Sequence, residues 1–72
     1  MSSRNIRLRF GERIRYLRTK AGLSQGDMSH TFGIDRSHIS DLENGKKEVC
    51  LELIETIADG FKISISELMK GV

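Results

Sequence analysis

The chain has 72 residues, of which 38% are hydrophobic and 31% are charged, a size and balance typical of one small globular domain. It contains no proline or tryptophan, and its single cysteine, Cys50, excludes an internal disulfide. One cysteine and two histidines are too few for a structural zinc site, so we expect no metal and no cofactor. No apolar run is long enough to cross a membrane, and residues 1–10 have no apolar core of a signal peptide, so we expect a cytoplasmic protein.

The formal net charge of +2 hides a gradient along the chain. Residues 1–20 carry seven basic side chains and one acidic one, whereas residues 48–72 carry five acidic side chains and two lysines. This asymmetry favours one face turned toward a polyanion and another turned away from it. A run of like charges is also typical of an ordinary solvated helix face, so the gradient leaves both interpretations open.

Hydrophobic spacing predicts an all-α fold of five short helices in one domain, residues 1–72, with residues 1–8 as a basic N-terminal arm. The first helix has its apolar residues on one stripe and ends near Gly22 in a left-handed turn. The stripe consists of Phe10, Ile14, Leu17 and Ala21.

The next two helices have clear start and stop signals. Ser24 is expected to cap the second helix, with Asp27 completing a capping box, and Gly33 to end it. Asp35 is expected to cap the third helix, and Gly45 to end it. The side chains expected to face inward are Met28, Phe32, Ile34, Ile39 and Leu42.

The last two helices are apolar and acidic. Cys50 lies at the N-cap position of the fourth helix, where we expect it to be a small buried residue. Ser64 and Glu67 form a Ser-x-x-Glu capping box for a short fifth helix ending near Lys70. The inward stripe expected for the fourth helix is Leu51, Ile54, Ala58 and Phe61.

Residues 22–45 have the order helix, glycine turn, helix, which is typical of a helix-turn-helix and also of a plain helical hairpin. Ser24 and Gln25, with the free N–H groups at the start of the second helix, suit a phosphate. The outward side chains of the third helix are mostly short and polar and suit base edges in a major groove. They are Arg36, Ser37, His38, Ser40, Asp41 and Asn44.

Four blocks distinguish between these alternatives: Leu23-Ser24-Gln25, Gly33-Ile34, Ile39-Ser40 and Glu43-Asn44-Gly45. At this spacing, residues 10–70 resemble the Xre family of phage-repressor-like DNA-binding domains. The segment 34–43, with two lysines after it, is most similar to the controller proteins of restriction–modification systems. The resemblance implies a lambda-repressor-like fold of five helices, with the helix-turn-helix in the second and third.

The resemblance also implies roles for individual residues. Ser24 and Gln25 match phosphate contacts. Positions that face bases are matched by Arg36, Ser37 and Asp41, and flanking positions by His38 and Ser40. The loop that meets phosphate is matched by Asn44, Lys46 and Lys47. Arg18 and Glu43 match a buried ion pair between the first and third helices. The sequence departs from the family pattern at Gly26, Ser29, Val49 and Cys50.

Side-chain chemistry sharpens some of these roles. Arg36 suits bidentate contact with guanine, or alternatively a phosphate. We expect Asp41 to hold Arg36 or Lys46 in place; the alternative is that it accepts a hydrogen bond from a cytosine amine. His30 is expected to be an exposed spectator. General attraction to DNA is expected from the arginine-rich first helix and the arm, together with Lys46 and Lys47.

One such domain reads few base pairs, so we expect a homodimer on a near-palindromic double-stranded DNA operator. The function expected is transcriptional regulation, with RNA polymerase as a further partner if the protein activates. The alternatives are the antitoxin of a toxin–antitoxin pair and a helical protein-interaction module. No enzyme is expected, because no Cys–His or Ser–His pair has a supporting third group. The expected dimer surface, about half of which would close the core instead, is Leu53, Ile57, Ile63, Ile65, Leu68 and Met69.

Overall fold

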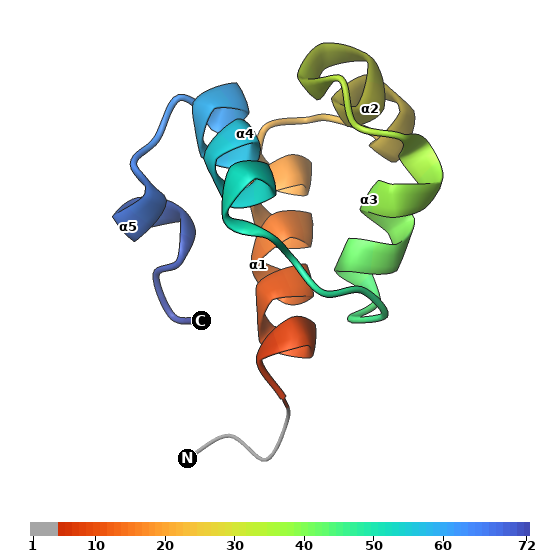
Figure 1. The fold of residues 1–72 in the computed structure, drawn as a ribbon. Helices are drawn as coiled ribbons and strands as arrows, with labels where there is room; N and C mark the ends of the chain where they lie inside the picture. Colours follow the sequence, from red (N-terminus) through yellow and green to blue (C-terminus); the bar gives the residue numbers. More distant parts are fainter. Residues whose placement is uncertain (1–4) are drawn as a thin grey trace.

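Five helices follow one another along residues 5–72, the part of the chain that the computed structural model describes (Figure 1). No strand occurs within these residues, and the predicted all-α, five-helix fold is confirmed. The helix α1 lies between α3 on one side and the α4–α5 pair on the other (Figure 1). The helices are α1 (Ile6–Lys20), α2 (Gln25–Phe32), α3 (Arg36–Glu43), α4 (Leu51–Phe61) and α5 (Ile65–Leu68).

The start of α1 corrects the predicted arm. The side chain of Asn5 caps the helix by accepting a hydrogen bond from the N–H of Leu8 at 3.1 Å. Residues 5–8 are therefore the cap and first turn of α1, and the remainder of the predicted arm, residues 1–4, lies outside the described residues. At the other end Gly22 adopts φ +75°, as predicted. Ala21 is exposed rather than buried, because it follows the last turn of the helix.

The caps of α2 and α3 differ. The predicted capping box of α2 is present: Ser24 Oγ accepts from the N–H of Asp27 at 2.9 Å, and the Asp27 carboxylate accepts from the N–H of Ser24 at 3.0 Å. The backbone hydrogen bond from Ser24 lowers the pKa of Asp27. At α3, the carboxylate of Asp35 accepts from the hydroxyl of Ser37 at 2.6 Å and caps no backbone N–H, so the predicted side-chain cap is wrong.

The core-facing line of α4 is rotated from the predicted one. Leu51 is 79% exposed, whereas Ile57 is fully buried. Ile57 forms an i, i+3, i+4, i+7 line with Ile54, Ala58 and Phe61. The predicted stripe fits one helix face equally well, so only tertiary packing selects Ile57 over Leu51.

Two further expectations at the helix starts are wrong. Cys50, at the N-cap of α4, is exposed and makes no cap hydrogen bond. Before α5, Ser64 Oγ accepts from the N–H of Glu67 at 3.0 Å, but the Glu67 carboxylate pairs with Arg13 at 3.2 Å instead of completing the box. The long Arg13 side chain reaches Glu67 from α1 and provides a charged partner that the backbone N–H of Ser64 is not.

The hydrophobic core draws on all five helices. Phe32 and Phe61 join α2 to α4 through an edge-to-face ring contact at 4.8 Å. Ile57 and Leu68, which were predicted on a dimer surface, are fully buried, so they close the monomer core instead. The buried apolar residues are Phe10, Ile14, Met28, Ile34, Ile39, Leu42, Ile57, Ala58 and Leu68.

The close approach of α1 to α3 depends on Gly11. This residue is buried, and a Cβ added to it would lie 2.7 Å from the carbonyl oxygen of Glu43, closer than atoms of this kind can approach. Glycine therefore sets the distance between the first helix and the third, a role that the hydrophobic pattern of α1 does not indicate.

We predict that Gly11→Ala lowers the free energy of unfolding by about 1–3 kcal/mol, because the backbone of α3 must move to admit the methyl group. The matched control is Gly26→Ala, since a Cβ on Gly26 in α2 meets nothing closer than Ser24 Oγ at 3.7 Å. That change should raise the free energy of unfolding by about 0.5–1 kcal/mol. Urea denaturation measures both, and equal effects of the two substitutions would contradict the packing argument.

Candidate nucleic-acid interface

The outer face of α3 carries the side chains predicted to read DNA. Ile39 and Leu42 turn inward and are buried, whereas Arg36, Ser37 and Asn44 are exposed and His38, Ser40 and Asp41 are half-buried. The structure brings several of them together around one shallow polar hollow of about 410 Å³. Its lining residues are Asp35, Ser37, His38, Asp41 and Lys47. His30, the expected spectator, is exposed on α2.

The carboxylate of Asp41 pairs with no cation of residues 5–72. Among the described residues, neither Arg36 nor Lys46 lies within ion-pair distance of it, and the link to Lys46 is a backbone hydrogen bond from its N–H to the Asp41 carbonyl at 2.9 Å. The expectation that Asp41 holds one of these cations is therefore wrong. A free carboxylate on this face can only accept hydrogen bonds.

The guanidinium of Arg36 lies beside Gly26, in the first turn of α2. Its Nη1 atom lies 4.0 Å from the position that a Cβ on Gly26 would occupy, so the missing side chain at Gly26 leaves space beside the guanidinium. Ser24 and Gln25 lie at the same end of α2. The first residue of α3 and the first turn of α2 thus present donors along one edge.

Glu43, at the C-terminal end of α3, is buried and lies at the centre of a hydrogen-bond network. The predicted ion pair is present: Arg18 of α1 donates from Nε to Oε2 at 2.6 Å and from Nη2 to Oε1 at 3.1 Å. The remaining Arg18 nitrogen, Nη1, donates to the carbonyl of Leu23 at 2.8 Å. Gln25 donates from Nε2 to Oε1 at 3.1 Å, and Arg15 from Nε to the same oxygen at 3.4 Å.

This network sets the protonation of both charged partners. Desolvation by burial on its own raises the pKa of Glu43, but the hydrogen bonds from Arg18 and Gln25 and the charge of Arg18 outweigh it, so the pKa lies below its ordinary value. The hydrogen bond to Glu43 raises the pKa of Arg18. The family resemblance implied the Arg18–Glu43 pair but not that Gln25 and Arg15 share the same carboxylate.

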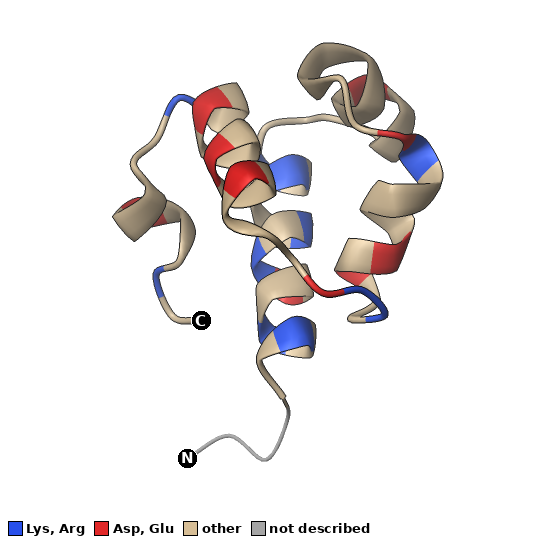
Figure 2. Ribbon diagram, in the orientation of Figure 1, with Lys and Arg blue, Asp and Glu red and all other residues tan. Residues whose placement is uncertain are grey.

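The arginines of α1 are used largely inside the molecule, although Lys and Arg recur along the whole helix (Figure 2). Arg9 donates to the carbonyl of Val72 at 2.8 Å. Arg13 donates to the carbonyls of Glu67 and Leu68, at 2.7 and 3.1 Å, and so caps the C-terminal end of α5. The expectation that the whole basic helix attracts DNA is therefore wrong for these side chains, because they are directed toward the C-terminal end of the chain.

The helix α2, the short turn at Gly33 and the exposed polar helix α3 together form a helix-turn-helix. The helix-turn-helix family model matches residues 14–68, and the chain belongs to this family. The chain is 38% identical to control protein C.MunI of Mycoplasma sp, over 94% of this chain and 93% of that protein.

Solved structures give the same result. The fold is similar to that of the restriction–modification controller protein C.AhdI from Aeromonas hydrophila, with a TM-score of 0.81 and 39% identity over 86% of this chain and 94% of that one. It is also similar to the controller protein C.Esp1396I, solved as a tetramer with its natural 35 base-pair operator, with a TM-score of 0.79 and 22% identity over 93% of each chain. At that identity the second likeness concerns the fold alone.

Within residues 5–72, no helix is both long and apolar enough to span a bilayer. No group of three or more His, Cys, Asp or Glu side chains there is placed to hold a metal ion.

We predict that Glu43 contributes to acid unfolding. Its pKa is lower in the folded than in the unfolded state, so its stabilising effect is complete above the unfolded value of about 4.3 and is lost as the pH falls toward the folded value. Urea denaturation from pH 7 to pH 3 should show Glu43→Gln far less stable than the wild type near neutrality, with the difference narrowing in acid. The control is Glu55→Gln on the exposed face of α4. A difference that stays constant with pH would contradict the assignment.

Proposed function

We propose that this protein is a cytoplasmic, sequence-specific regulator of transcription that binds double-stranded DNA with α3 in the major groove. The observation that carries the proposal is the exposed polar face of α3, held by the Glu43 network at a fixed orientation to the phosphate-facing start of α2. No step in this role requires catalysis.

Similarity to controller proteins supports a narrower proposal, that the regulator acts on the operon of a restriction–modification system, its own gene included. Within the interface we assign base contacts to Arg36, Ser37 and Asp41. Phosphate contacts are assigned to Ser24, Gln25, Asn44, Lys46 and Lys47, while His38 and Ser40 flank the bases. The acidic or apolar replacements that would favour a protein-interaction module are absent at Gln25, Arg36 and the loop lysines.

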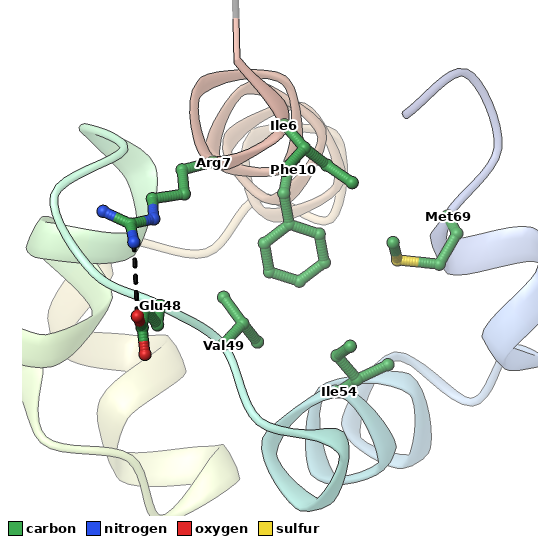
Figure 3. Close-up of a pocket in the computed structure, with 7 residues that line it drawn as sticks. All are labelled: Ile6, Arg7, Phe10, Glu48, Val49, Ile54 and Met69. Carbon is green, nitrogen blue, oxygen red and sulfur yellow. Dashed lines mark hydrogen bonds and ion pairs between the residues drawn. The ribbon is translucent and has the colours of Figure 1, made fainter.

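We propose that the protein binds as a homodimer through an apolar band on the side of the molecule opposite α3. Ile6, Leu51 and Ile65 are three of the large apolar side chains left exposed among the described residues. They line two neighbouring pockets that share Ile54. Figure 3 shows the smaller of the two, of about 210 Å³, with Phe10, Val49 and Met69 around it and the Arg7–Glu48 pair at its edge.

This band differs from the surface expected from the sequence. Of the expected residues, Ile65 is exposed and Met69 lines the pocket, whereas Leu53 and Ile63 are half-buried against the core. The proposed band adds Ile6, which the sequence places in the arm, and Leu51, which the sequence places in the core stripe of α4. A second copy is the occupant that a regulator of palindromic operators requires.

Selection of bound sites from random duplex DNA tests the function directly. A near-palindromic consensus is the expected result, because two α3 helices of a twofold dimer read equivalent half-sites. Absence of any enriched sequence, from protein whose fold is verified by circular dichroism, would overturn the proposal.

We predict that Arg36→Ala weakens binding to the selected site by about 1–3 kcal/mol and relaxes the preference at one base pair in each half-site. Fluorescence anisotropy with the selected duplex and with single-base variants of it measures both effects. A loss of affinity that is equal for every duplex would instead assign Arg36 to a phosphate.

We predict that Leu51→Asp converts the dimer to a monomer, because the apolar band would bury an uncompensated carboxylate. Sedimentation at tens of micromolar protein measures the oligomeric state. The control is Thr56→Asp, which introduces the same charge on the exposed surface of α4 at a position that does not line either pocket. Dimers that persist in Leu51→Asp would place the interface elsewhere.

A further inference from the structure

Arg15 differs from the neighbouring arginines of α1. Arg9 and Arg13 are directed to carbonyls near the C-terminal end of the chain, and Arg18 is nearly buried against Glu43. The side chain of Arg15, in contrast, is 53% exposed and lies on the α3 side of α1.

The charge of Glu43 is already balanced without Arg15. Arg18 makes two hydrogen bonds to this carboxylate, at 2.6 and 3.1 Å, and Gln25 adds a third at 3.1 Å. The Arg15 contact is the longest of the four, at 3.4 Å, and comes from the exposed side. One carboxylate thus faces two guanidinium groups, and the outer one is surplus positive charge at the surface.

The guanidinium of Arg15 lies between Gln25 and Asn44, two side chains to which phosphate contacts are assigned. Arg15 Nε and Gln25 Nε2 lie within 3.4 Å of the same Glu43 oxygen, so the start of α2 is adjacent. Arg15 Nη2 also donates to Asn44 Oδ1 at 3.4 Å, and Asn44 in turn donates to the carbonyl of Ser40 at 2.9 Å. Gln25, Arg15 and Asn44 therefore form a row of donors from α2, α1 and the end of α3.

We propose that Arg15 is a further phosphate-binding residue, whose guanidinium turns from Glu43 and Asn44 to a DNA phosphate when α3 enters the groove. A guanidinium binds phosphate through paired N–H donors, and its departure leaves Glu43 neutralised by Arg18. The inference rests on the proposed function, because it concerns a contact within that same DNA complex.

The experiment measures the salt dependence of binding by the full chain to a fluorescein-labelled duplex of mixed sequence, between about 50 and 200 mM NaCl. Each lost phosphate contact should lower the slope of log K against log [NaCl] by about 0.9. We expect this loss for each protomer in Arg15→Gln, and an unchanged slope in Arg15→Lys, which keeps the charge. Lys70→Gln, beyond α5, is the control for removing a remote positive charge, and Lys47→Gln is the positive control.

Thermal unfolding separates a binding role from a structural one. Arg15→Gln should melt close to the wild type, because the contacts it loses are long and exposed. A wild-type slope in Arg15→Gln, beside a reduced slope in Lys47→Gln, would overturn the inference and leave the proposed function standing. Unfolding of Arg15→Gln would also overturn it, since Arg15 would then be a structural partner of Glu43. Wild-type protein that binds no duplex at all would overturn both proposals.

Discussion

The buried carboxylate of Glu43 constrains how α1, α2 and α3 can be arranged, because a charge removed from water must find its partners inside the protein. Those partners come from two other helices, Arg18 from α1 and Gln25 from α2. Displacing either helix would leave the carboxylate without part of its compensation. A single side chain at the end of α3 thereby fixes the angle at which the third helix and the start of the second face a ligand together.

The helix α1, which provides Arg18 to Glu43, also holds α5 in place through Arg13. The short helix α5 has four residues, too few for a stable helix in isolation. Arg13 satisfies two of its terminal carbonyls from α1, and Leu68 inserts into the core. Arginines at different positions of α1 thus fasten α3 on one side and α5 on the other, which accounts for the density of positive charge in a helix that also contributes to the core.

Local signals in the sequence were sufficient for much of the fold. The Ser24–Asp27 capping box, the left-handed glycines at positions 22 and 33 and the inward side chains of α3 are short-range features, and all were predicted correctly. The predicted cap at Asp35 failed locally, because its carboxylate accepts from Ser37, but most errors arose where partners are distant in the sequence. Whether Arg13 faces solvent or the end of α5, whether Leu51 or Ile57 faces the core, and how closely Gly11 approaches α3 depend on tertiary packing, which periodicity within one helix does not encode.

Some features of the candidate site could likewise be predicted from the sequence, and others could not. Residue type and the motif placed the outward face of α3 and the buried ion pair, because both follow from helix period and family spacing. The free carboxylate of Asp41 and the sharing of Glu43 by Arg15 and Gln25 could not be predicted, since they depend on where the ends of long side chains lie in the folded protein.

The arginines of α1 that bond within the protein have a kinetic consequence for a regulator searching a chromosome. With fewer free cations to hold it on arbitrary sequence, each non-specific encounter is brief, and a larger fraction of the protein remains available for its operator.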